Sequence, residues 1–137
     1  MKLVILESPY AGKTEEEVIR NIAYARRCLR DSLKRQEAPI ASHLLYTQPG
    51  VLDDKNEDER TCGINAGLAW GRVAEGAVIY TDLGITPGME LGIKRHESEG
   101  TTIEYRQIGA TVCHSCLQAD KTCPVYPQDW QSCGQYQ

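Results

Sequence analysis

The distribution of apolar and polar residues along the chain predicts four strands separated by helices. A continuous apolar run at residues 2–6 is typical of a strand buried on both faces. Shorter apolar runs at 39–42 and 77–81 predict two more strands. A fourth is predicted at 102–106, where alternating residues favour the edge of a sheet.

The helical spacing of apolar residues, together with capping residues, predicts three helices between the strands. Thr14 and Glu17 form a capping box before an amphipathic segment. Asn56 or a neighbouring residue is a suitable N-cap for the second helix, which we expect to end at Gly76. The third helix is predicted over 86–99, because it opens with a threonine and a proline.

The resulting order, βαβαβαβ, predicts a doubly wound α/β domain of the flavodoxin-like or Rossmann-like kind, with a parallel sheet covered by helices. We expect this domain to span residues 1–108, followed by a small Cys-rich extension at 109–137. Ligands of such folds bind beyond the carboxyl ends of the strands. The loops at 7–13, 42–54 and 81–88 meet that criterion.

Composition narrows the range of partners. The chain has 15 basic and 19 acidic residues and a net charge of −4, which disfavours a DNA or RNA backbone as the partner. No apolar run approaches the ~20 residues of a membrane helix, and the first strand is too short for a signal-peptide core. We therefore expect a soluble, cytoplasmic protein with no membrane partner.

The Gly12-Lys13-Thr14 sequence lies between a strand and a helix, where nucleotide-binding P-loops occur. A P-loop needs another glycine five positions before Gly12, and that residue is Glu7. This disfavours an NTPase. Anion binding at the helix start stays open, as does a solvated Lys13 with no ligand.

Residues 80–92 carry the most informative pattern. Asp82 follows a predicted strand, Glu90 lies in the first turn of the next helix, and Gly84 and Gly88 allow a ligand to approach the backbone. A carboxylate at a helix start can act as an ionised nucleophile toward an electrophilic sugar carbon. The alternative is that Glu90 only offsets the helix dipole.

The Gly-Met-Glu-Leu-Gly sequence at 88–92 resembles the nucleophile segment of nucleoside 2-deoxyribosyltransferases. The Ser-Pro-Tyr-Ala-Gly loop at 8–12 is similar to the loop after that family's first strand, and residues 39–46 resemble a Pro-His-Leu-Tyr stretch of the wider superfamily. The likeness covers about residues 1–108 and is greatest to small phage-encoded members of that superfamily.

This resemblance implies that Glu90 attacks the anomeric carbon of a deoxynucleoside and forms a covalent glycosyl-enzyme. It implies that Tyr10 orients Glu90 or contacts the base, that Asp82 binds base or sugar, and that His43 lines the pocket and assists proton transfer. It further implies a homo-oligomer in which a neighbouring chain helps to close the site, and no organic cofactor. The other expected ligand-binding residues are Ser8, Pro9, Gly12, Gly84, Gly88 and Met89.

The chain also departs from the family. Residues 65–71 lack the carboxylate that the family carries in the helix before its third strand, and the interval from Asp82 to Glu90 is longer than usual. Two other functions therefore stay open. One is a non-catalytic binder that sequesters a nucleotide-derived signal, as a phage counter-defence protein would. The other is an interaction module that uses the Cys-rich tail.

Four of the six cysteines lie in the last 25 residues: Cys113, Cys116, Cys123 and Cys133. The two-residue spacing of the first pair lets two thiolates bind one metal ion, and the second pair completes a tetrahedral set, with His114 as an alternative ligand. This predicts a structural zinc site. Free thiols and an iron–sulfur cluster are the alternatives, whereas disulfides would need an oxidising compartment.

Overall fold

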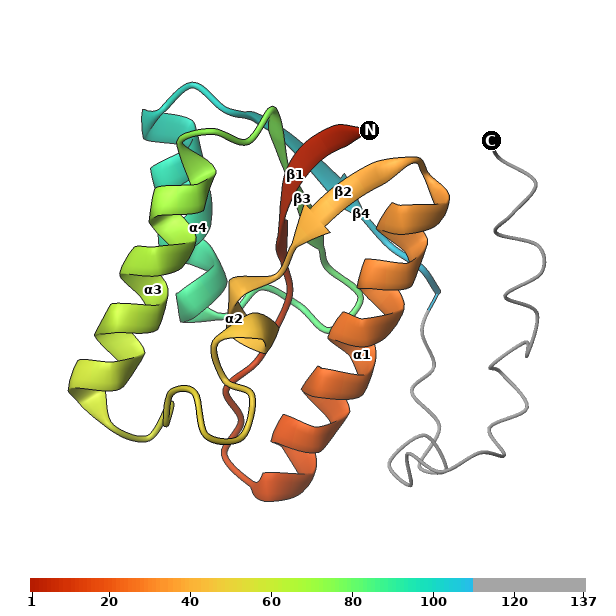
Figure 1. Ribbon diagram of the computed structural model, residues 1–137. Coiled ribbons are helices and arrows are strands. Elements are labelled where there is room, and N and C mark those ends of the chain that lie inside the picture. Colours follow the sequence, from red (N-terminus) through yellow and green to blue (C-terminus); the bar gives the residue numbers. More distant parts are fainter. Residues whose placement is uncertain (110–137) are drawn as a thin grey trace.

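The computed structural model describes residues 1–109, which form a four-stranded parallel sheet with helices on both faces (Figure 1). The strand order is β2-β1-β3-β4, the flavodoxin-like order, so the predicted fold class is confirmed. No helix within 1–109 is long and apolar enough to cross a membrane. The elements are β1 (Lys2–Glu7), α1 (Glu15–Lys34), β2 (Glu37–Ile40), α2 (Ser42–Leu45), α3 (Glu57–Gly71), β3 (Gly76–Tyr80), α4 (Pro87–Ser98) and β4 (Thr102–Arg106).

Alternating side chains of the central strands bury both faces of the sheet. On one face Leu6 and Val78 pack with Tyr24 of α1, and on the other Ile79 packs with Met89 of α4. Helix α1 covers the first face, while α3 and α4 lie together over the second (Figure 1). This arrangement follows from right-handed crossovers on either side of β1.

The predicted helix starts are confirmed by their caps. Thr14 Oγ1 accepts a hydrogen bond from the Glu17 amide at 3.2 Å, and Asn56 caps α3 with its side-chain oxygen. Thr86 caps α4, and Pro87 fills the first helical position, where no amide hydrogen is needed.

The predicted end of the second long helix is wrong. Helix α3 ends at Gly71, because Gly76 already belongs to β3, where it pairs with Val4 and Thr102. The glycine that the sequence marks as a helix end is therefore the first residue of a strand. Its place in the strand is determined by pairing with residues far away in the sequence.

The second strand also differs from its prediction at 39–42. Strand β2 covers Glu37–Ile40 and pairs with β1 from Lys2 to Ile5. Ser42 then begins the four-residue helix α2, inside a segment that the sequence predicts to be a loop. The fourth strand does lie at a sheet edge, as predicted.

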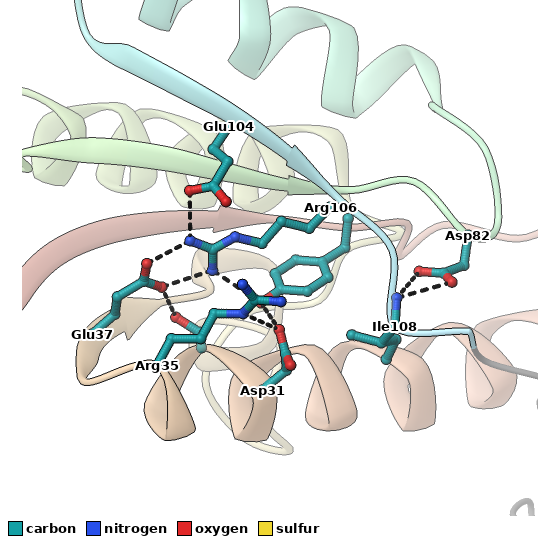
Figure 2. Close-up of polar contacts among 9 residues, drawn as sticks. Asp31, Arg35, Glu37, Asp82, Glu104, Arg106 and Ile108 are labelled. Atoms are coloured by element: carbon teal, nitrogen blue, oxygen red, sulfur yellow. Dashed lines mark hydrogen bonds and ion pairs between the residues drawn. The ribbon is translucent and has the colours of Figure 1, made fainter.

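A buried ion pair connects the two edge strands (Figure 2). Arg106 of β4 donates two hydrogen bonds to Glu37 of β2, at 2.5 and 2.8 Å, and Ser32 of α1 donates a third at 2.6 Å. Arg106 lowers the pKa of the Glu37 carboxyl below its ordinary value, because the guanidinium stabilises the ionised form. The pair therefore holds β2, β4 and α1 to one another.

Candidate functional site

A cavity of about 330 Å³ opens at the carboxyl edge of the sheet, on the face that carries α3 and α4. Its wall comes from the end of β1 and the loop after it, from α2, and from the facing sides of α3 and α4. The volume is at the lower end of small-molecule pockets. The position, beside the point where the strand order reverses between β1 and β3, is where such folds bind ligands.

Five of the residues predicted to bind ligand line this cavity: Ser8, Tyr10, His43, Gly88 and Met89. The Ser8 hydroxyl and His43 Nε2 share a hydrogen bond of 2.7 Å, and the Tyr10 ring stands edge-on to the His43 ring, with 6.5 Å between centroids. The loop that carries Tyr10 is itself fixed, because the buried Asn21 side chain donates to the Tyr10 carbonyl at 3.0 Å. The structure thus brings the loop after β1 and the helix α2 together into one polar wall.

Burial determines the charge of His43. It lowers the pKa of the imidazole to about 4, because the charged form loses hydration. His43 is therefore neutral at pH 7. A neutral ring can accept a hydrogen bond from Ser8 or, in the other tautomer, donate one to it.

The other predicted site residues do not line the cavity: Pro9, Gly12, Asp82, Gly84 and Glu90. Glu90 is exposed in the first turn of α4. Gly84 has a φ of +85° and forms a turn in which its amide donates to the Thr81 carbonyl. This positive φ explains why position 84 is a glycine, and no ligand is needed to explain it.

Asp82 anchors a neighbouring segment of the chain. Its carboxylate accepts hydrogen bonds from the Tyr24 hydroxyl at 2.6 Å, from the Ile108 amide at 3.1 Å and from the Gly109 amide at 2.9 Å. Figure 2 shows the contact with Ile108. Burial and the bond to Asp82 raise the pKa of Tyr24, so its hydroxyl stays protonated and donates. Asp82 therefore fixes the chain after β4 against β3 and α1.

Sequence reasoning missed four ionisable side chains in the cavity lining: Glu7, Asp54, Arg60 and His96. His96 Nε2 lies 3.4 Å from Glu7 Oε1. Glu7 had a usable signal, because it is a carboxylate at the carboxyl end of a buried strand. His96 had a weaker one: it lies eight residues after Gly88, and residues at multiples of four share a helix face.

Asp54 and Arg60 add opposite charges to the lining. Burial raises the pKa of Asp54, and the positive charge of Arg60 opposes that shift. Arg60 is exposed, so it remains in contact with solvent. The lining therefore combines carboxylates, imidazoles and a guanidinium with the apolar side chains of Ile64 and Leu68.

A family model described as a domain of unknown function (DUF7768) matches residues 2–106, which include every described strand and helix. The chain belongs to this family. The match ends with β4, and the domain boundary expected after residue 108 stays a prediction. No curated protein matches the chain.

Among solved structures, the chain is similar to a 2-deoxyribosyltransferase from the psychrotolerant bacterium Bacillus psychrosaccharolyticus. The TM-score is 0.54 at 15% sequence identity, over 98% of this chain and 92% of that chain. The two proteins therefore share a fold, as the sequence resemblance implies.

The four cysteines predicted to bind zinc, Cys113, Cys116, Cys123 and Cys133, lie outside the described residues, as does the extension that contains them. Within residues 1–109, no three His, Cys, Asp or Glu side chains gather as metal ligands. The zinc site stays a prediction, and elemental analysis of protein purified without chelator tests it.

Proposed function

We propose that the protein binds a nucleoside or nucleotide in the cavity and acts on its N-glycosidic bond, as a deoxyribosyltransferase or hydrolase. The observation that carries this proposal is the Glu7 carboxylate in the wall of a cavity at the strand-order switch point. Cleavage of a glycosidic bond develops positive charge on the sugar, and a nearby carboxylate stabilises that charge.

The chemistry of the remaining lining supports the same ligand class. Tyr10 offers an aromatic ring to a base, while Ser8 and His43 offer hydrogen-bonding groups. The 2-deoxyribosyltransferase that shares the fold is described as a biocatalyst for the synthesis of nucleosides, which supports nucleosides as the substrate class.

A non-catalytic binder of a nucleotide-derived signal is the second candidate. It is favoured by the exposed position of Glu90, since the residue that the resemblance makes the nucleophile does not line the cavity. We also propose that the protein is of phage origin and is located in the cytoplasm. In both candidate functions it forms a homo-oligomer in which a neighbouring chain completes the site. Gel filtration with light scattering tests the oligomer.

The proposed function is tested by incubating the protein with deoxynucleosides, ribonucleosides, their 5′-phosphates and ADP-ribose. Free base is followed by chromatography, and binding by calorimetry. Base release supports the enzyme, and binding without release supports the non-catalytic binder. No heat of binding and no base release with any of these compounds would contradict both.

A matched pair of variants assigns the binding to the cavity. Ile64→Trp places a large ring in the cavity wall, whereas Ile19→Trp makes the same change on an exposed position of α1. We expect binding to weaken at least about tenfold only in Ile64→Trp, with the fold checked by circular dichroism. Equal affinity in both variants would show that the ligand binds elsewhere.

A further inference from the structure

Helix α4 contains a recess that accommodates the Glu7 carboxylate. A Cβ atom added at Gly92 would lie 2.6 Å from Glu7 Oε1, so the glycine leaves the space that the carboxylate occupies. A real Cβ does not approach another atom that closely. Any side chain larger than glycine at position 92 would therefore displace the Glu7 carboxylate.

One turn further along α4, His96 completes the recess. Its side chain is 2% exposed, and Nε2 lies 3.4 Å from Glu7 Oε1. Its Nδ1 is buried with no hydrogen-bond partner in the described part of the chain. A proton on Nε2 therefore gives the ring its hydrogen bond, donated to Glu7.

The Glu7 side chain keeps access to the cavity, because it is 19% exposed and lines the wall. Within residues 1–109, His96 is its single side-chain partner, which leaves the second carboxylate oxygen available to a ligand. Glu90 lies on a different side of α4. Each residue advances about 100° around a helix, so Glu90 lies about 200° around from Gly88, which faces the cavity.

We propose that Glu7 is the catalytic carboxylate of this site and that His96 is its positioning residue. The inference rests on the proposed function. A Glu7 oxygen bonds to the anomeric carbon as the carbon–nitrogen bond breaks and its electron pair leaves with the base. The base takes a proton from water. The resulting hydroxide attacks the anomeric carbon, and the electron pair of the ester bond returns to Glu7.

Glu7→Gln and Glu90→Gln form the matched pair that tests the assignment, because each removes one negative charge with little change in shape. We expect Glu7→Gln to lower kcat/KM for base release at least about 100-fold, with nucleoside affinity within about tenfold. Glu90→Gln should stay within about threefold of the wild type. The reverse pattern, or activity retained in Glu7→Gln, would overturn the assignment and leave the proposed function standing.

Mapping the covalent intermediate gives a second readout that needs no variant. Tryptic cleavage places Glu7 in the peptide 3–13, where it is the sole acidic residue, and Glu90 in the peptide 73–94. After an acid quench during turnover, mass spectrometry should find the sugar on 3–13. A sugar on 73–94 would overturn the role of Glu7. A wild type that releases no base from any nucleoside would contradict the proposed function itself.

The positioning role of His96 is tested by the split between kcat and KM. His96→Leu should lower kcat about tenfold or more at unchanged KM, because the substrate still binds while the carboxylate loses its orientation. His96→Gln, which keeps an N–H donor, should recover most of kcat. Equal kcat in His96→Leu and the wild type, or no recovery in His96→Gln, would contradict this role.

Discussion

At the scale of single residues, His43 makes the stability of the protein depend on pH. Its pKa falls from an ordinary 6.5 to about 4 in the folded chain, so between these values the unfolded chain binds more protons. We expect the free energy of unfolding to decrease as pH falls through this window, by about 1.4 kcal/mol per pH unit at most.

Denaturant titrations at pH 7, 6, 5 and 4 measure this dependence, with His43→Gln as the comparison. The variant lacks the titrating ring, so its stability should change less over the same range. An unchanged slope in His43→Gln would contradict the assignment to this histidine.

Gly92 offers a second prediction at the residue scale. Gly92→Ala places a methyl group where Glu7 Oε1 lies, so the carboxylate must move. We expect base release to fall roughly 100-fold, since displacement of a catalytic group by about 1 Å has effects of that size. The control is Gly63→Ala in α3, whose methyl group would lie 3.3 Å from the end of the flexible Leu52 side chain and 3.9 Å from Tyr46 Cβ. Equal rates in the two variants would contradict the recess.

At the scale of elements, the N-cap Thr14 stabilises the first turn of α1. Thr14→Ala removes the acceptor for the Glu17 amide, which we expect to lower the free energy of unfolding by about 1 kcal/mol. Urea unfolding measures the loss. Thr14→Ser keeps the hydroxyl and should stay close to the wild type, and an equal loss in Thr14→Ser would show that the methyl group matters instead.

Sequence patterns predicted the helices and strands well where the groups that bond to one another are close in sequence. The caps at Thr14 and Thr86 bind amides three residues away, so the sequence alone identifies them. The end of α3 was mispredicted because Gly76 is recruited into β3 by pairing with Val4. Short-range patterns do not contain that information.

At the scale of the whole molecule, the Glu37–Arg106 ion pair connects strands that are 69 residues apart in sequence. Glu37→Leu leaves Arg106 buried without its main partner, and we expect it to cost about 3–5 kcal/mol of unfolding free energy. The double variant Glu37→Leu/Arg106→Met removes both charges and should recover part of that loss. Thermal and urea unfolding measure both, and no recovery would contradict a charge effect.

The Glu37–Arg106 ion pair also makes the free energy of unfolding decrease as the pH falls into the acid range. The pKa of Glu37 is lowered from 4.5, so its contribution is present above that value and is lost as pH falls through the lower, folded pKa. This loss begins near pH 4.5, at the acid end of the range in which His43 acts. We therefore expect Glu37→Leu to be less stable than the wild type by a constant amount above pH 4.5, and the difference to shrink only at the acid end.

The sequence by itself determined the order of strands and helices, the helix starts and the edge of the sheet at which the cavity opens, because these follow from apolar periodicity and from caps a few residues apart. Tertiary structure decided which carboxylate reaches the cavity. Glu7 meets Gly92 and His96 more than 80 residues away, while Asp82 binds backbone amides after β4. The direction of a side chain depends on packing between distant elements, which no local pattern records.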